Sequence, residues 1–256
     1  MNANAPFHRK YVPRKLSEMV GVDYLQPQFA AFANQKTIGG LIFFGPNGYG
    51  KTTLAEILLR RMFCERPTGL DACLDCNCCR VFDGETVWSD YCSLFGERIT
   101  PEISKYLFMK FFIYAPSTLY VKTLLINDLD RADMSFLLSI PSLLDEYPLS
   151  PMLFTVTNIE RIPNPVRQRC KIITMKDITP VEFSRLIRRV CKTESIRIED
   201  ENAITLLKRM VGNNPRIALT VLETIKNENL SLSVEALQKD SVTSCLGVLT
   251  GESISS

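Results

Sequence analysis

Two sets of residues near the start of the chain have types and spacings suited to chemistry. One is the run Gly45-Pro46-Asn47-Gly48-Tyr49-Gly50-Lys51-Thr52, which fits the phosphate-loop pattern G-x-x-x-x-G-K-[ST]. The other set comprises Cys64, Cys73, Cys76 and Cys79, in the insert 64–79 just behind the loop. The first set predicts nucleotide binding, and the second predicts a zinc site.

The residues on either side of the phosphate loop support the motif. The apolar run 41–44 before it is typical of a buried parallel strand, and apolar residues recur at helical spacing over 51–63. In such a strand–loop–helix unit, glycines let backbone N–H groups surround the β-phosphate, and the helix adds its positive end. We expect Lys51 to reach the β- and γ-phosphates of ATP or GTP, and Thr52 to ligate magnesium. Further nucleotide contacts are expected from Gly45, Asn47, Gly48, Tyr49, Gly50 and Thr53.

The four cysteines are separated by eight, two and two residues, which suits a tetrahedral thiolate site. Cys76 and Cys79 would form a tight knuckle, Cys64 would lie at the end of the preceding helix, and Cys78 is an extra thiol in the same turn. The alternative is a set of buried structural cysteines, which five thiols within sixteen residues disfavour. A closed four-ligand site leaves no position for substrate, so the expected role of the zinc is structural.

A second polar site is expected where the strand 121–126 ends. Phosphate-loop ATPases place an acidic pair there, one residue holding magnesium and the next orienting the attacking water. This chain has Asn127 and Asp128 instead. An amide is a weaker magnesium ligand than a carboxylate, and Asp128 is one methylene shorter than glutamate. If the alignment shifts by one residue, Asp128 becomes the magnesium ligand and Leu129 takes the place of the base; either alignment predicts slow hydrolysis.

Three further positions carry polar groups that could reach a nucleotide. Thr157 and Asn158 follow the strand 152–156, where they either face a γ-phosphate or cap the strand end. Arg169 precedes the last strand, and Arg216 opens a later helix. A solitary surface arginine is usually only solvated, but the joint placement of these residues favours a role for them.

The composition is that of an ordinary globular protein, with 46% hydrophobic and 23% charged residues among 256. Since domains hold about 100–200 residues, two domains are expected. The net charge of +2 gives no general attraction to nucleic acid. The start lacks a signal-peptide pattern and no apolar stretch approaches the roughly 20 residues of a membrane span, so we expect a cytoplasmic protein. Nine cysteines there would be thiols or metal ligands, and the one histidine, His8, lies far from them in sequence.

Strands alternate with helices over the first two thirds of the chain, which predicts an α/β fold with a parallel, doubly wound sheet. After residue 175 the strand signal stops and helices follow. We predict an ATPase domain at 1–177 with the zinc module at 64–79, a helical lid at 178–242 and a tail at 243–256. The expected strands are 41–44, 90–94, 121–126, 152–156 and 171–175; the expected helices are 51–63, 101–112, 135–146, one opened by Thr179-Pro180, 203–210 and 217–225.

Together these residues resemble the clamp loader ATPases of the AAA+ superfamily, specifically the gamma/tau subunit of bacterial DNA polymerase III. The resemblance covers nearly the whole chain, and the cysteine module is its specific part because most AAA+ ATPases lack it. It implies ATP, Mg²⁺ and Zn²⁺ as cofactors. It also implies a ring or spiral with other clamp loader subunits that opens a sliding clamp and places it on primer–template DNA. Its motifs are Lys10-Tyr11-x-Pro13, Val20-Gly21, the phosphate loop, the cysteine module, Tyr114-Ala115-Pro116, Leu144-Asp145-Glu146 and Arg169-Cys170.

The resemblance also implies roles for single residues. Tyr11 and Val20 would line the adenine pocket, Thr157 and Asn158 would be sensor 1, and Arg216 would be sensor 2. Arg169 would be an arginine finger that acts on ATP in a neighbouring subunit. Lys51, Asp128, Asn158 and Arg169 would then be the catalytic set, with Thr52 and Asp128 at magnesium.

The chain departs from the family pattern at several points. It has Tyr11-Val12-Pro13 for Tyr-Arg-Pro, Asn127-Asp128 for Asp-Glu, and Gln168-Arg169-Cys170 for Ser-Arg-Cys. The sequence also stops about where the family's helical collar, its main oligomerisation element, would begin. Assembly would then use faces of the ATPase domain and partner subunits, unless a longer product was cut.

We therefore predict an ATP-binding clamp loader subunit with weak hydrolysis. The main alternative is a non-hydrolysing stator or assembly module resembling delta-prime, favoured by Asn127 and opposed by the intact Lys51 and Thr52. A third possibility is an initiator or branch-migration AAA+ ATPase, suggested by the Asn-Pro-Arg at 214–216 and opposed by the cysteine module. Contact with DNA is expected from Arg98, Lys105 and Lys110, unless these form only a solvated basic face.

Overall fold

The computed structural model describes residues 5–35, 39–82, 90–212 and 214–250. These residues form two compact units. The sheet unit comprises residues 14–46 and 50–175, and the helical unit comprises residues 1–13, 47–49 and 176–256, each as far as it is described. The predicted domain boundaries at 177 and 242 stay a prediction.

The sheet unit is built on five parallel strands in the order β2-β3-β4-β1-β5. Central strand β1 is almost fully buried, and Ile42 lies between Phe154 of β4 and Ile172 of β5. This confirms the predicted α/β fold with a parallel sheet; the bounds of β4 match the prediction, and those of the other strands differ from it by at most two residues. The strands are β1 (Gly40–Phe44), β2 (Tyr91–Phe95), β3 (Thr123–Asn127), β4 (Met152–Val156) and β5 (Cys170–Thr174).

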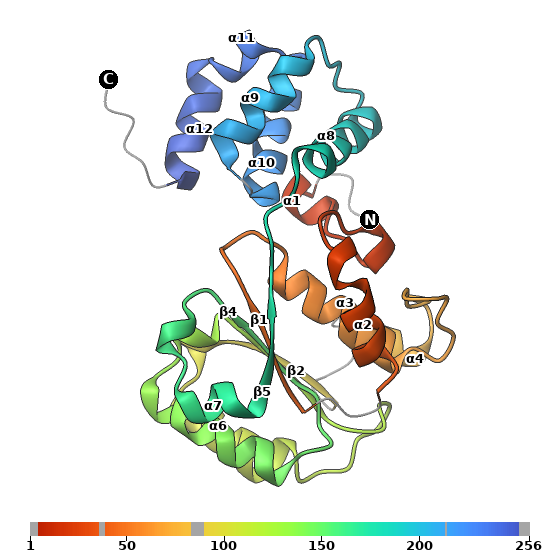
Figure 1. The fold of residues 1–256 in the computed structure, drawn as a ribbon, viewed down its shortest axis with the longest axis vertical. Helices are drawn as coiled ribbons and strands as arrows, with labels where there is room; N and C mark the ends of the chain where they lie inside the picture. The colour runs from red at the N-terminus through yellow and green to blue at the C-terminus, as the bar shows by residue number, and fades with distance from the viewer. Residues whose placement is uncertain (1–4, 36–38, 83–89, 213, 251–256) are drawn as a thin grey trace. The chain divides into compact units, whose positions relative to one another are not determined.

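Helices cover both faces of this sheet. Figure 1 shows α2, α3 and α4 on one side and α6 and α7 on the other. Helix α3 buries Leu54, Ile57 and Leu58, whose spacing places them on one face. The helices are α2 (Gln26–Ala33), α3 (Lys51–Phe63), α4 (Asn77–Val81), α5 (Pro101–Tyr106), α6 (Met134–Glu146) and α7 (Asn164–Arg169), with short turns η1 (Leu16–Glu18), η2 (Asp23–Leu25), η3 (Gly96–Arg98), η5 (Leu129–Arg131) and η6 (Ile159–Arg161).

The helix expected at 101–112 is not uniform. It starts as α5, capped by Thr100, and continues as the π-helical turn η4 (Leu107–Phe111). A π-turn holds more residues per turn than an α-helix, so it brings Phe112 closer to the face of Leu107 and Phe111. All three side chains are buried in the core.

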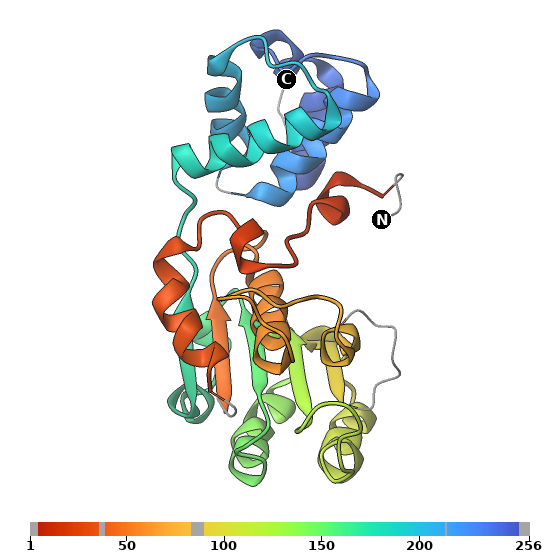
Figure 2. The same cartoon turned by 90° about the vertical axis from the view of Figure 1, so that its right-hand side faces the viewer.

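The helical unit contains α1 (Phe7–Lys10) near the N-terminus and the helices α8 (Pro180–Glu194), α9 (Glu201–Val211), α10 (Pro215–Asn227), α11 (Val234–Leu237) and α12 (Asp240–Thr250). Figure 2 shows these helices from a second side. Helix α8 begins with a capping box in which the side chain of Thr179 accepts from the amide of Glu182, and the side chain of Glu182 accepts from the amide of Thr179. Helix α12 begins just before the predicted lid boundary at 242 and ends at Thr250, with Val242 and Leu246 buried.

Parallel strands bring their carboxyl ends to one edge of a sheet, and ligands bind there where the strand order reverses. Here the order reverses at β1, whose two neighbours are β4 and β5. The phosphate loop follows β1 directly. Among the described residues, no helix has the length and apolar character needed to cross a bilayer.

Candidate nucleotide site and metal centre

The phosphate loop owes its shape to its glycines. Gly48 and Gly50 have φ of 81° and 79°, in the left-handed region that glycine adopts without strain. Gly50 is also the residue from which α3 starts, and its carbonyl accepts from the amide of Leu54 at 2.8 Å. The loop therefore leads from the end of β1 into the N-terminus of a 13-residue helix, as an anion-binding loop requires.

The side chain of Lys51 folds back beneath the loop. Its ammonium donates to the carbonyls of Gly45 at 2.8 Å and Pro46 at 3.0 Å, and to the hydroxyl of Thr157 at 3.1 Å. Lys51 is only 6% exposed. A buried cation held by neutral oxygens is placed to be neutralised by a phosphate.

Thr52 meets the end of β3 through Asn127. The Thr52 hydroxyl donates to Oδ1 of Asn127 at 2.7 Å, and the Asn127 amide group donates to Oγ of Ser93 at 3.3 Å and to the carbonyl of Leu94 at 3.4 Å. The neighbouring strand β2 thus orients the amide so that its oxygen faces Thr52. Asn127 and Thr52 together present a neutral pair of oxygens where a magnesium ion would be held.

Asp128 leaves the strand in a left-handed conformation, with φ of 49°. Its amide donates to Oγ1 of Thr155 on β4 at 2.9 Å. A side chain at Gly96 would collide with the Asp128 carbonyl, since a Cβ there would lie 2.3 Å from that oxygen. The chain therefore turns sharply at Asp128. The magnesium and catalytic roles of Asp128 stay predictions.

Asp130 ties the ends of β3 and β4 together. Its two carboxylate oxygens accept from the amides of Thr157 at 3.1 Å and Asn158 at 3.0 Å. Asn158 in turn caps η6, because its Oδ1 accepts from the amide of Glu160 at 3.1 Å. Thr157 is thus fixed with its hydroxyl on Lys51, whereas the side chain of Asn158 serves the local turn. Asp130 was not singled out from the sequence, although it lies only three residues after Asn127.

The remaining expected nucleotide contacts are divided between the two units. Val20 and Thr53 are half-buried in the sheet unit, whereas Tyr11 and Arg216 belong to the helical unit. Arg216 is exposed in the first turn of α10. Asn214, which caps that helix, donates to the carbonyl of Asn47, and Tyr49 donates to Asp177 at 2.7 Å.

Arg169 ends α7 on the surface of the sheet unit. Its Nε donates to both carboxylate oxygens of Asp145 at 2.9 and 3.1 Å, and its Nη1 donates to the carbonyl of Pro165 at 3.3 Å. The side chains of Arg169 and Asp145 are 40% and 60% exposed. The guanidinium is therefore oriented and still open to solvent. The basic residues Arg98, Lys105 and Lys110 are also exposed.

The four predicted cysteines come together. The sulfurs of Cys64, Cys73, Cys76 and Cys79 all lie within 4.8 Å of one another, and those of Cys73 and Cys79 are 3.9 Å apart. A tetrahedron with zinc–sulfur bonds of about 2.3 Å has sulfurs about 3.8 Å apart, so the donors suit zinc in type and in spacing. The Cys78 thiol is not part of this set and donates to Glu65 and to the carbonyl of Thr118.

The thiols of the cluster differ in acidity. Hydrogen bonding from the backbone of Asp75 lowers the pKa of the Cys73 thiol to about 6, whereas burial raises the pKa of Cys64 and Cys79. Asp71, within the insert, also accepts from the amide and hydroxyl of Ser17 at 3.1 and 2.6 Å. The cysteine insert is thereby attached to the segment that leads to Val20.

Comparison with known proteins connects this geometry to a family. A family model described as "DNA polymerase III, delta subunit" matches residues 24–179. Curated relatives include the DNA polymerase III subunit gamma/tau of Mycoplasma genitalium, 26% identical over 91% of this chain and 39% of its own length. The DNA polymerase III subunit gamma of Buchnera aphidicola is 27% identical over 96% of this chain and 65% of its own length. The chain thus spans between about one third and two thirds of the length of such relatives.

Solved structures agree on the fold. The Thermotoga maritima RuvB Holliday junction branch migration motor superposes with a TM-score of 0.65 at 16% identity, covering 95% of this chain and 73% of that one. This likeness shows that the two proteins share a fold. Since the family model spans more than half of the sequence, the chain belongs to the family described as DNA polymerase III, delta subunit, and resembles its gamma/tau relatives.

Proposed function

We propose that this protein is an ATP-binding subunit of a loader that opens the sliding clamp of a DNA polymerase and places it on primer–template DNA. The observation that carries the proposal is the Lys51 ammonium beneath the phosphate loop, 3.1 Å from the Thr157 hydroxyl that Asp130 positions. The names of the curated relatives support the connection to replication. The other loader subunits, the clamp and the DNA are proposed partners.

The residues at the strand ends divide the work on the nucleotide. Backbone N–H groups of the phosphate loop and the ammonium of Lys51 bind the phosphates, and Thr157 orients that ammonium. We propose Tyr11 and Val20 as contacts of the adenine and Arg216 as sensor 2. Arg169 stabilises negative charge on ATP held by a neighbouring subunit, since its guanidinium is exposed.

Magnesium fits this site through oxygen ligands. The Thr52 hydroxyl and Oδ1 of Asn127 are 2.7 Å apart, and Asp128 adds a carboxylate next in sequence. A bound magnesium ion would supply positive charge to the transferring phosphate. With an amide in place of one carboxylate, this chain holds the ion more weakly, and slow hydrolysis follows.

A non-hydrolysing stator is the second candidate. One observation favours it: Ser93 and Leu94 accept hydrogen bonds from the amide nitrogen of Asn127, which a carboxylate could not donate. The site is thus fitted to an amide. In that case ATP is bound but not turned over, and Arg169 serves a neighbour.

The deciding experiment is ATP turnover by the full chain, alone and with a sliding clamp, primed DNA and the partner subunits, at low and high salt. Clamp loading with ATP binding and measurable turnover supports the loader ATPase. ATP binding and loading without turnover by this chain supports the stator. Loading by the partners that is unchanged when this chain is left out would contradict both.

Zinc is proposed for Cys64, Cys73, Cys76 and Cys79, where it would act as a structural ion. Its loss should unfold the insert, because structural zinc in small modules contributes roughly 10–16 kcal/mol of apparent binding free energy. Metal analysis of freshly purified, reduced protein should find about one zinc per chain, and less in Cys76→Ser. Cys78→Ser, outside the cluster, is the matched control; a parent protein without zinc would refute the proposal.

A further inference from the structure

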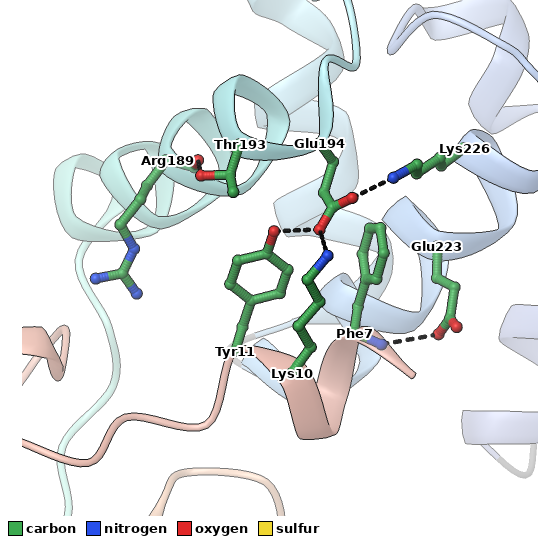
Figure 3. A network of polar contacts seen from close by, with 8 residues as sticks. All are labelled: Phe7, Lys10, Tyr11, Arg189, Thr193, Glu194, Glu223 and Lys226. Carbon is green, nitrogen blue, oxygen red and sulfur yellow. Dashed lines mark hydrogen bonds and ion pairs between the residues drawn. The ribbon is translucent and has the colours of Figure 1, made fainter. Parts of the chain in front are cut away.

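A buried carboxylate joins the N-terminal segment to helices α8 and α10 within the helical unit. Glu194 is the last residue of α8, and its side chain is 2% exposed. One oxygen accepts from the ammonium of Lys10 at 2.5 Å and from the hydroxyl of Tyr11, and the other accepts from the ammonium of Lys226 on α10. Figure 3 shows the three donors converging on Glu194 from two separate parts of the chain.

The position of this carboxylate is unfavourable by itself. The C-terminal end of a helix carries partial negative charge, and burial disfavours any unpaired charge. Burial acts to raise the pKa of Glu194, but hydrogen bonds from Lys10, Lys226 and Tyr11 outweigh it and lower the pKa to about 2. Glu194 is therefore charged, and Lys10 and Tyr11 of the N-terminal segment help to stabilise this buried charge.

The N-terminal segment is in turn held in place by contacts with helix α10. Helix α1 has only four residues, and none of its caps is a side chain. Such a short helix does not persist alone in water. It is held by buried Phe7, whose amide donates to Glu223 at 3.2 Å and whose ring lies 5.6 Å from the ammonium of Lys226.

Tyr11 is the part of this network that matters for the nucleotide. Its hydroxyl is held by Glu194, and its ring packs edge-on against Phe7 with centroids 5.6 Å apart. Arg189 and Thr193 are the other polar groups of α8 near this hydroxyl. The hydroxyl of Tyr11 is thus held by α8, and its ring is held by Phe7 of α1.

We infer that Glu194 is a positioning residue for nucleotide recognition, which holds the ring of Tyr11 on the helical unit so that the segment Phe7–Tyr11 and helix α8 move as one body when adenine is bound. This inference rests on the proposed function for Tyr11 in the adenine pocket. Glu194 acts on the base only through Tyr11 and not on the phosphates. Its loss should therefore lower the affinity for ATP and leave the affinity for inorganic triphosphate unchanged.

The first test needs no nucleotide. Hydrogen exchange of the amides of residues 7–11 is compared in the parent protein, Glu194→Gln and Lys10→Met. Because hydrogen bonds to a charged group are among the stronger ones, exchange in both variants should be about tenfold faster. Glu228→Gln removes the same charge from an exposed residue at the end of α10 and should leave exchange at the parent rate.

The second test compares ATP with inorganic triphosphate as ligands of the same variants. Glu194→Gln should weaken ATP binding by about three- to tenfold and change triphosphate binding by less than about twofold, since one charge-assisted contact is lost. Tyr11→Phe keeps the ring but removes its hydroxyl, and should act in the same direction as Glu194→Gln. Equal weakening for both ligands would overturn the positioning role.

The outcomes separate this inference from the proposed function. Parent-like exchange in Glu194→Gln and Lys10→Met would show that the segment is not held by Glu194 and would overturn the inference. Faster exchange with unchanged ATP affinity would overturn the link to adenine and leave ATP binding intact. If the parent itself binds no ATP, the proposed function fails together with the adenine role, and the exchange data alone decide whether the segment is docked.

Discussion

The carboxyl ends of β1 and β3 lie at the same edge of the sheet but differ in the functional groups that they carry. The end of β1 has every group that a phosphate loop needs, with Lys51 and Thr52 in place. The end of β3 has Asn127 where a carboxylate would hold magnesium. Under the proposed function, the groups that bind phosphate follow β1 and those that hold magnesium and orient water follow β3, so the two sets belong to separate strands.

The residues around Asn127, at the end of β3, suit an amide side chain. The amide nitrogen of Asn127 donates to Ser93 and to the carbonyl of Leu94 on β2. A carboxylate oxygen in that place would face the Leu94 carbonyl oxygen, and the pair would repel. Asn127 is therefore fitted to this strand pair rather than tolerated by it.

The largest expected effect concerns Arg169, a group that a second chain would add to the nucleotide site. If Arg169 acts on ATP of a neighbour, Arg169→Ala should lower turnover of the assembled loader by about 10³-fold while ATP binding stays, as for an arginine finger given in trans. An Arg169→Ala chain mixed with a Lys51→Ala chain should regain part of the turnover, because the second chain lends its arginine to the first.

The control for this experiment is Asp145→Asn. It removes the charge of the carboxylate that Arg169 contacts at 2.9 Å but keeps an amide oxygen that can accept the same hydrogen bond, so the guanidinium stays oriented and turnover should change little. Parent-like turnover in a loader built only from Arg169→Ala chains would disprove the role in trans.

The next effect tests the two strand ends directly. Lys51→Ala should weaken ATP binding by about 100-fold, because a charged donor to the phosphates is lost. Asn127→Ala, at the end of β3, should leave ATP binding without magnesium within about twofold, since the side chain of Asn127 contacts Thr52 and strand β2 rather than Lys51. Calorimetric titration of both variants with ATP measures the difference. Equal losses of ATP affinity would mean that the two strand ends do not have separate roles.

A smaller effect should follow from restoring the acidic pair. Asn127→Asp with Asp128→Glu adds charge at the metal and returns the reach of the longer side chain, so turnover should rise about tenfold. The structure adds an expected penalty, since the new carboxylate faces the Leu94 carbonyl. Without magnesium the double variant should be less stable than the parent by about 1–3 kcal/mol. Unchanged turnover with every partner present would favour the stator.

Much of this site was visible in the sequence because its signals are local. The phosphate loop, the strand before it and helix 51–63 are consecutive, and the four cysteines are close enough in the chain for spacing alone to group them. The strand and helix periodicities likewise placed the sheet. The π-turn at 107–111 was missed, because buried apolar residues recur there at spacings that an ordinary helix also shows.

The contacts that order the site were not visible, because they join distant parts of the chain. Asp130, after β3, accepts from Thr157 at the end of the neighbouring strand β4, and Glu194 meets Lys10 and Tyr11 from 184 and 183 residues away. Nothing in the pattern around Glu194 distinguishes it from a solvated glutamate at a helix end. Such acidic groups become recognisable only when the fold shows which donors face them.

The smallest expected effect concerns Asp130, which links the altered end to the intact one. Its carboxylate accepts from the amides of Thr157 and Asn158, and Thr157 accepts from Lys51. In Asp130→Asn one oxygen becomes an amide nitrogen that faces an N–H donor, so one of the two hydrogen bonds is lost. The sheet unit should be destabilised by about 1 kcal/mol, and ATP affinity should fall about fivefold, less than in Lys51→Ala.

Asp133→Asn is the matched control, since Asp133 is exposed and its side chain makes no capping hydrogen bond to α6. Chemical denaturation and ATP titration of the two variants measure both effects. If Asp130→Asn and Asp133→Asn have the same stability and the same ATP affinity, the contact of Asp130 with Thr157 does not influence ATP binding at the end of β1.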